Sequence, residues 1–205
     1  MAGGNRSGWR FTALLGVALV LTGLVSTPAS VGLSLYRSAC ELQGALRATE
    51  NAKVALARKR LLGAMHAAHV ARAASSAPGA ELLGWAPLAN DLKALGALGG
   101  AVETMGAAGL IASSGLPRTT QGRNFVGELY SDGRVRVDRL ASLADGIGEA
   151  VPVLSEALRQ LEVSPPPTLG PVERALDAAR TRLAKGIDSA RRGELVLDAL
   201  PNMLG

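Results

Sequence analysis

The chain has 205 residues and a net charge of +5; 48% of the residues are hydrophobic but only 3% are aromatic. Two residues each of Phe, Tyr and Trp are too few for an ordinary β-sandwich or barrel, whose strands favour aromatic and β-branched side chains. A single Cys excludes a disulfide scaffold and a Cys-based zinc site. Ala, Leu and Gly make up nearly half of the chain, so the composition predicts an all-α protein.

The positive charge lies in the first third of the chain. Residues 1–72 contain nine basic and two acidic residues, whereas residues 73–205 contain thirteen basic and fifteen acidic ones. We expect the basic helix over residues 37–72 to make at most a weak contact with anionic lipid or an anionic wall polymer. Nucleic acid is not expected as a partner, because Tyr36 is the one aromatic residue available to stack on bases there.

The strongest signal is a stretch of 26 residues between Arg10 and Arg37 without a charged side chain. A membrane-spanning helix needs about 20 predominantly apolar residues. The sequence therefore predicts a cytoplasmic tail over residues 1–10, a transmembrane anchor over residues 11–35 and an extracytoplasmic body. The side chains expected to contact lipid are Phe11, Leu14, Leu15, Val17, Leu19, Val20, Leu21, Leu24 and Val25.

A cleaved signal peptide is the main alternative to the anchor. Thr27 and Ala29 occupy the positions that signal peptidase prefers, and two Arg residues precede the apolar run. The retained anchor is favoured because the apolar run continues to Tyr36. A buried core helix is the third interpretation.

Residues 36–112 are predicted to form a long helical hairpin. The first helix is expected to run without interruption to Ser75, since no Pro occurs there. Its expected apolar face is Leu42, Leu46, Leu56, Leu61, Met65 and His69. The packing seam of the second helix is Trp85, Leu88, Leu92, Leu95, Gly99 and Val102, continued by Gly106 and Gly109. These glycines weaken a helix by about 1 kcal/mol each relative to Ala, and indicate either close helix packing or a frayed end.

Residues 113–137 are predicted to be a loop or one short β-hairpin near residues 125–137, because Asp132-Gly133 favours a tight turn. Residues 138–205 are predicted to form a second helical pair joined by a Pro-rich connector over residues 164–171. Asp138 is the expected N-cap of the first helix, and Pro152 is expected to kink or split it. The last helix is expected to end at Pro201, with its apolar face formed by Val172, Leu176, Ala179, Leu183, Ile187 and Ala190.

No pattern in the sequence indicates catalysis. The Gly-rich stretch of residues 96–109 has no preceding strand and no following Lys-Ser or Lys-Thr, so it does not predict a phosphate-binding loop. His66 and His69 share a helix face without further metal-ligand candidates nearby. We therefore predict a protein that is not an enzyme and has no metal and no cofactor.

The order of elements resembles the N-terminal portion of a family of membrane-anchored bacterial proteins called domain of unknown function 4012. The matching elements lie at Trp85–Leu92, Asp132–Leu140 and Leu200–Gly205, the last reading Leu-Pro-Asn-Met-Leu-Gly. The resemblance implies a location at the cell envelope. It also implies that a globular region normally follows the last element, so this chain is expected to be a truncated piece or a free-standing stalk.

The resulting functional hypothesis is a membrane-anchored, extracytoplasmic helical stalk or scaffold, partnered by the membrane and by either another protein or the missing C-terminal region. Two alternatives remain open at this point. The first is a sensory or adaptor bundle that signals through a partner. The second is a secreted helical binding protein, produced by cleavage after Ala29.

Overall fold

The computed structural model describes residues 30–49, 53–76, 88–114, 130–131 and 134–204. These residues form a helix over 30–49 and four further helices: α2 (Val54–Ser75), α4 (Ala89–Ala112), α6 (Val137–Glu162) and α7 (Gly170–Leu204). Strands β1 (Tyr130–Ser131) and β2 (Arg134–Val135) pair antiparallel over two residues each. The described chain is thus almost entirely helical, which confirms the predicted all-α class.

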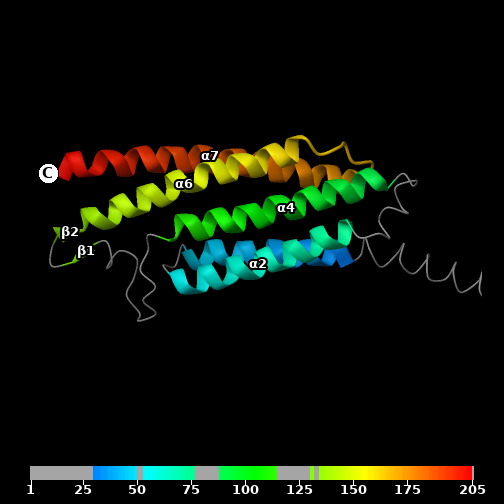
Figure 1. Cartoon of the computed structure of the whole chain (residues 1–205), viewed down its shortest axis with the longest axis horizontal. Helices are drawn as coiled ribbons and strands as arrows, with labels where there is room; N and C mark the ends of the chain where they lie inside the picture. Colours follow the sequence, from blue (N-terminus) through cyan, green and yellow to red (C-terminus); the bar gives the residue numbers. More distant parts are fainter. Residues whose placement is uncertain (1–29, 50–52, 77–87, 115–129, 132–133, 205) are drawn as a thin grey trace, which may run out of the picture.

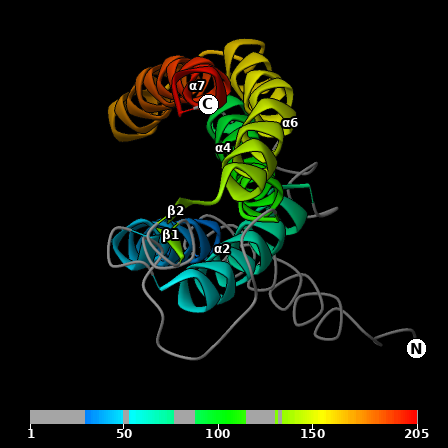
Figure 2. The same cartoon turned by 90° about the vertical axis from the view of Figure 1, so that its left-hand side faces the viewer.

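The helices form an elongated rod in which successive helices run in opposite directions (Figure 1). Each helix packs mainly on the next one in the chain, α2 on α4, α4 on α6 and α6 on α7. Seen end-on, they follow an open arc from the helix over 30–49 to α7 (Figure 2). We call the end that carries Ser30, Ser76, Leu88 and the connector 163–169 the proximal end, and the opposite end the distal end.

The prediction of one uninterrupted helix from residue 35 to residue 75 is wrong. The helix over 30–49 and α2 lie side by side and run in opposite directions (Figure 1). Arg60 of α2 lies against Gly44 and forms a 2.9 Å ion pair with Glu41. The chain reverses without Gly or Pro, because folding back gives both helices a neighbour against which to bury one face.

The apolar face predicted for α2 is also wrong in part. The residues that α2 buries are all alanines: Ala57, Ala64, Ala67, Ala68 and Ala71. Leu46 and Leu56, both expected in the seam, are 66% and 41% exposed. Small side chains line most of the interface because the two helices approach closely, and the larger Leu61 and Met65 lie where α4 has glycine.

Glycines on α4 provide the other half of this close interface. A Cβ added to Gly99 would lie 3.1 Å from the carbonyl oxygen of Ala68, and one added to Gly106 would collide with Met65. Gly109 packs on Leu61 in the same way. α4 remains helical to Ala112, so these glycines serve close packing and not a frayed end.

The hydrophobic core lies where α4, α6 and α7 meet. Its buried members are Ala94, Leu98, Ala101, Ala157, Leu161, Leu176, Leu183 and Ile187. The predicted apolar face of the last helix is confirmed, because Leu176, Leu183 and Ile187 are at most 4% exposed. Leu35 packs against the same core from the first described helix.

Three expectations for α6 and α7 need correction or completion. Asp138 is not the N-cap of α6; the cap is Arg136, which forms a 3.2 Å ion pair with Asp138. α6 is one helix through Pro152 and is not split. α7 does not end at Pro201 but continues to Leu204.

Candidate functional site

The residues predicted to contact lipid, from Phe11 to Val25, lie outside the described part of the chain. The last residues of the predicted anchor are described, and they belong to the rod. Val31 is completely buried and Leu35 packs against the core cluster, whereas Leu33 between them is 70% exposed.

The predicted packing seam lies on α4, apart from Trp85, which is outside the described residues. Leu92 and Gly99 are buried, while Leu88, Leu95 and Val102 are partly buried. α4 is long and apolar enough to cross a membrane by length and composition alone. Within the described chain α2 and α6 pack on it, and 39% of its apolar stretch is buried.

The one buried carboxylate that the structure describes belongs to Asp91, which is only 2% exposed. Its Oδ1 accepts hydrogen bonds from the backbone N–H groups of Thr168 at 3.0 Å and Leu169 at 2.8 Å. Its Oδ2 accepts a third one from the Thr168 hydroxyl. Thr168 and Leu169 directly precede α7, so Asp91 of α4 caps the N-terminus of α7, where backbone N–H groups have no partner within the helix.

Two arginines cap helix C-termini in the same manner. The guanidinium of Arg180 on α7 donates hydrogen bonds of 3.2 and 2.6 Å to the carbonyl oxygen of Leu161, near the end of α6. Arg58 on α2 donates to both the hydroxyl and the carbonyl oxygen of Ser113, which follows α4. Each cation meets the negative end of a helix dipole, and Asp91 meets a positive one.

These three caps join helices through residues that lie far apart in sequence or on different helices. None of these caps was predicted from the sequence, although Asp91 is a charged residue directly beside the apolar position Leu92. A helix pattern shows that a carboxylate lies beside a seam. It does not show which helix end from another part of the chain will reach it.

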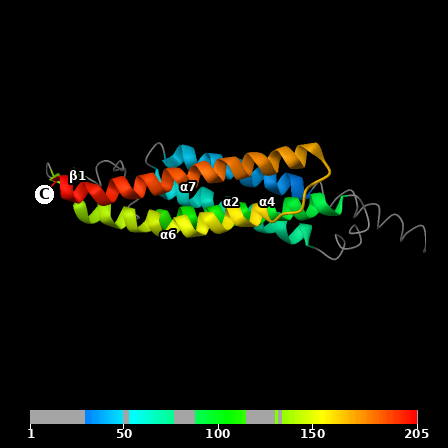
Figure 3. The same ribbon diagram turned by 90° about the horizontal axis from the view of Figure 1, so that it is seen from above.

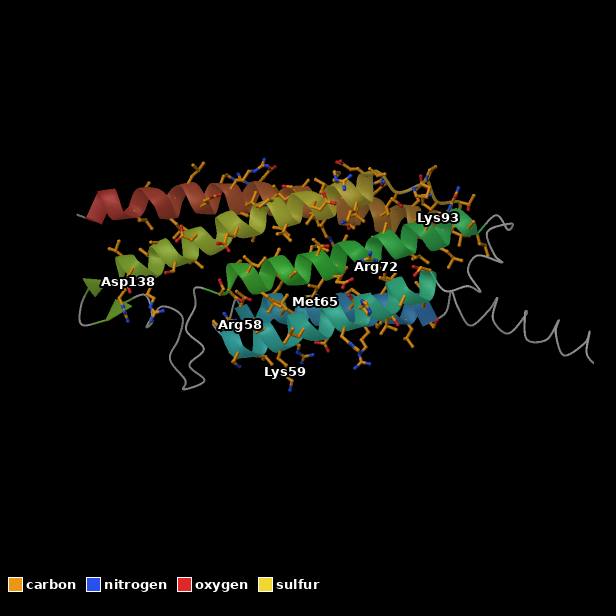
Figure 4. The ribbon with its side chains drawn as sticks, in the orientation of Figure 1. Arg58, Lys59, Met65, Arg72, Lys93 and Asp138 are labelled. Carbon is orange, nitrogen blue, oxygen red and sulfur yellow. The ribbon has the colours of Figure 1, made fainter. Side chains whose placement is uncertain are left out.

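At least three of the seven basic residues between 37 and 72 have acidic or carbonyl partners within the chain. Arg58 caps α4, Arg60 pairs with Glu41, and Arg72 lies 3.5 Å from Glu103 of α4. Figure 4 shows Lys59 pointing away from the other helices, in contrast to Met65, which lies between α2 and α4. Arg60 and Arg72 nevertheless remain 47% and 63% exposed.

The described titratable groups do not converge on a reaction centre. Within that part of the chain, no three His, Cys, Asp or Glu residues are close enough together to hold a metal ion. His69 lies 3.5 Å from Glu103, and His66 is exposed. A shallow hollow of 370 Å³ is lined by Asp188, Arg191 and Arg192, which all belong to one stretch of α7.

One exposed ion pair on α6 has a clear electrostatic effect. Arg159 donates hydrogen bonds of 2.7 and 2.6 Å to the two carboxylate oxygens of Glu156. These bonds, assisted by one from Gln160, lower the pKa of Glu156 from 4.5 to about 2. The pair belongs to the surface of α6, where it holds the carboxylate in its charged form.

Comparison of the chain with protein-family models, with curated protein sequences and with solved structures finds no match.

Proposed function

We propose that this protein is a non-catalytic helical stalk, anchored in the membrane by its N-terminal apolar run and standing outside the cytoplasm. The observation that carries the proposal is the direct junction between the run and the rod. Only residues 26–29 separate Val25 from Ser30 of the first described helix, and Val31 is already buried in the rod. A rigid body attached this closely to an anchor suits a structural support.

The use of charge supports a structural role as well. The charged side chains with the most specific partners, Asp91, Arg58 and Arg180, all bind helix ends of the same chain. α7 alone has 35 residues, which corresponds to a length of about 50 Å at a rise of 1.5 Å per residue. The antiparallel helices thus hold a long, thin shape, as a spacer or scaffold requires.

The resemblance to the family called domain of unknown function 4012 fits the same placement at the cell envelope. A second copy, another protein or a following globular region would complete the assembly on the stalk. The secreted alternative keeps one specific argument in its favour, because cleavage after Ala29 would leave Ser30 of the described helix as the new N-terminus.

Alkaline extraction of membranes combined with intact-protein mass measurement tests the anchor. We expect the full chain, with its original N-terminus, to stay with the bilayer. The double variant Leu19→Arg with Val20→Arg should be released, because each Arg at the centre of a membrane helix costs about 2.5–3.5 kcal/mol. The matched control is Leu195→Arg with Val196→Arg, which adds the same charge at exposed positions of α7.

Two results would contradict the proposal. One is a wild-type protein that alkaline extraction releases and whose mass begins at Ser30, which is the secreted form. The other is a double variant at positions 19 and 20 that stays in the membrane as firmly as the α7 control. Protease added to intact cells should digest the rod, and a protected rod would place it in the cytoplasm.

A further inference from the structure

The proximal end of the rod exposes apolar side chains from two distant parts of the chain. Leu33 and Tyr36, on the first described helix, are 70% and 69% exposed. Val163 and Leu169, in the connector between α6 and α7, are 73% and 45% exposed. Figure 3 shows this connector at the same end of the rod as the start of the helix over 30–49.

Packing fixes these two segments together. Leu35, between Leu33 and Tyr36, packs on the core cluster that contains Leu161 and Leu176. Asp91 holds Thr168 and Leu169 through its three hydrogen bonds. The exposed side chains are therefore part of one rigid surface, whose position relative to the N-terminus of the chain is set by the fold.

The segment that precedes the first described helix indicates what this surface contacts. The 29 residues before Ser30 include the apolar run Phe11–Val25 and join the rod at its proximal end. The 20 residues from Phe11 to Ser30 would, as a helix, be long enough to cross the hydrocarbon core, about 30 Å thick. At 1.5 Å per residue, Leu33 and Tyr36 then lie roughly 5 and 9 Å beyond it, in or beside the headgroup layer.

The distal end exposes apolar residues too, among them Leu46, Leu195 and Val196, but no membrane segment joins the described chain there. Tyr36 adds a side chain that favours membrane interfaces, where its ring is apolar and its hydroxyl stays hydrated. Exposed charges at the proximal end are mixed: they include Arg37, Arg72, Arg174 and Lys93, the last labelled at this end in Figure 4, as well as Glu162 and Glu173. Contact with lipid would thus be mainly apolar.

We propose that the proximal end rests on the bilayer, with Leu33, Tyr36, Val163 and Leu169 in the headgroup region. The stalk would then stand on its membrane at two places, the anchor and the α6–α7 connector. This fixes the tilt of the rod, which a single helix crossing the membrane would leave free. The inference rests on the proposed function, because it requires the apolar run to be a membrane anchor.

Site-specific fluorescence of the full chain in vesicles tests the contact. The sole cysteine, Cys40, is exposed and is first replaced by Ser. Val163→Cys and, as a matched control, Val196→Cys are each labelled with an environment-sensitive dye and reconstituted into vesicles of phosphatidylcholine and phosphatidylglycerol. Lipids that carry a nitroxide just below the headgroup serve as quencher, and flotation of the vesicles reports anchoring independently.

We expect the dye at position 163 to show blue-shifted emission and to be quenched for the most part by the nitroxide lipid. The dye at position 196 should show neither effect. If the protein floats but the dye at 163 behaves as in water, the contact is absent while the anchor stands. If the dye at 163 is blue-shifted but not quenched by the nitroxide, protein and not lipid covers this end, and the inference is wrong. A protein that does not float overturns the proposed function itself.

Discussion

Gly146 and Gly186 offer a matched test of how closely the helices pack. A Cβ on Gly146 of α6 would lie 3.1 Å from the carbonyl oxygen of Ala112 and 3.2 Å from that of Ile111, at the end of α4. Both contacts are with backbone, which cannot rotate away as a side chain can. A Cβ on Gly186, in the interior of α7, would meet nothing within 4 Å.

Both substitutions gain the higher helix propensity of Ala, but only Gly146→Ala also has an overpacking cost. Replacing a helical Gly by Ala stabilises a helix by up to about 1 kcal/mol, so Gly186→Ala should raise the free energy of unfolding by that amount. Gly146→Ala gains the same term but has to move α6 away from α4, and forcing an extra methyl group into a packed interior costs about 1–3 kcal/mol. The difference between the variants isolates this overpacking cost.

Urea and thermal unfolding, followed by circular dichroism in the same detergent, measure that difference. For a chain of this size, 1 kcal/mol corresponds to a change in Tm of about 2–4 °C. Gly146→Ala should therefore melt several degrees below Gly186→Ala. Equal stability of the two variants would refute the close contact between α6 and the end of α4, and with it the close helix packing on which the proposed stalk depends.

Three further predictions concern the polar contacts. Asp91→Ala should lower the free energy of unfolding by about 2–3 kcal/mol, because hydrogen bonds to a charged group contribute about 1.5–3 kcal/mol and two N–H groups lose their cap. Urea titration measures this loss. In the same titration the control Asn90→Ala, at the exposed neighbouring residue, should have almost no effect. Arg58→Met should cost about 1 kcal/mol by uncapping α4, and a melting temperature equal to that of the wild type would argue against this cap. In an NMR titration Glu156 should show a pKa of about 2, and Arg159→Gln should return it toward 4.5. The pKa of Glu156 is lower in the folded protein than in the unfolded chain. The stabilisation by the Glu156–Arg159 pair is therefore complete at a pH above the ordinary pKa of Glu and is lost as the pH falls toward 2. Added salt should weaken this stabilisation.

The apolar face of α7 was predictable because its buried positions are occupied by Leu and Ile at helical spacing. Leu176, Leu183 and Ile187 are buried, as the pattern indicated, whereas four of the six buried positions of α6 are Ala or Gly. The Pro-rich connector also lies where the sequence places it. In α7 one strongly apolar stripe faces the core, so local periodicity and tertiary packing favour the same face.

Prediction failed where alanine competes with leucine. Along α2 the Leu pattern indicated one face, but the fully buried residues are alanines, among them Ala64, Ala68 and Ala71. Of the predicted face, Leu61 and Met65 are partly buried and lie against Gly109 and Gly106 of α4. Burial of Leu alone would stabilise the other face more strongly. The close approach of two backbones over several turns adds many small contacts, and only a partner helix with glycine at matching positions makes that approach possible.

The contact of Asp91 with the α6–α7 connector was likewise predictable only in its separate parts. The sequence indicated a charged residue at Asp91 and a break near residues 164–171, but nothing in either segment shows that they meet. Their contact depends on α4 and α7 lying side by side at the proximal end. Likewise, the sequence could not show that Val163 and Leu169 share one end of the rod with Leu33 and Tyr36.

The sequence by itself determined that the chain is helical, where α4, α6 and α7 lie, and that an apolar run precedes the rod, because composition and periodicity act within one segment. The tertiary structure decided the reversal after residue 49, the alanine–glycine interface, the three helix caps and the surface of the proximal end. Each of these depends on the distance between segments far apart in the chain, and that distance is set only when all the helices pack together.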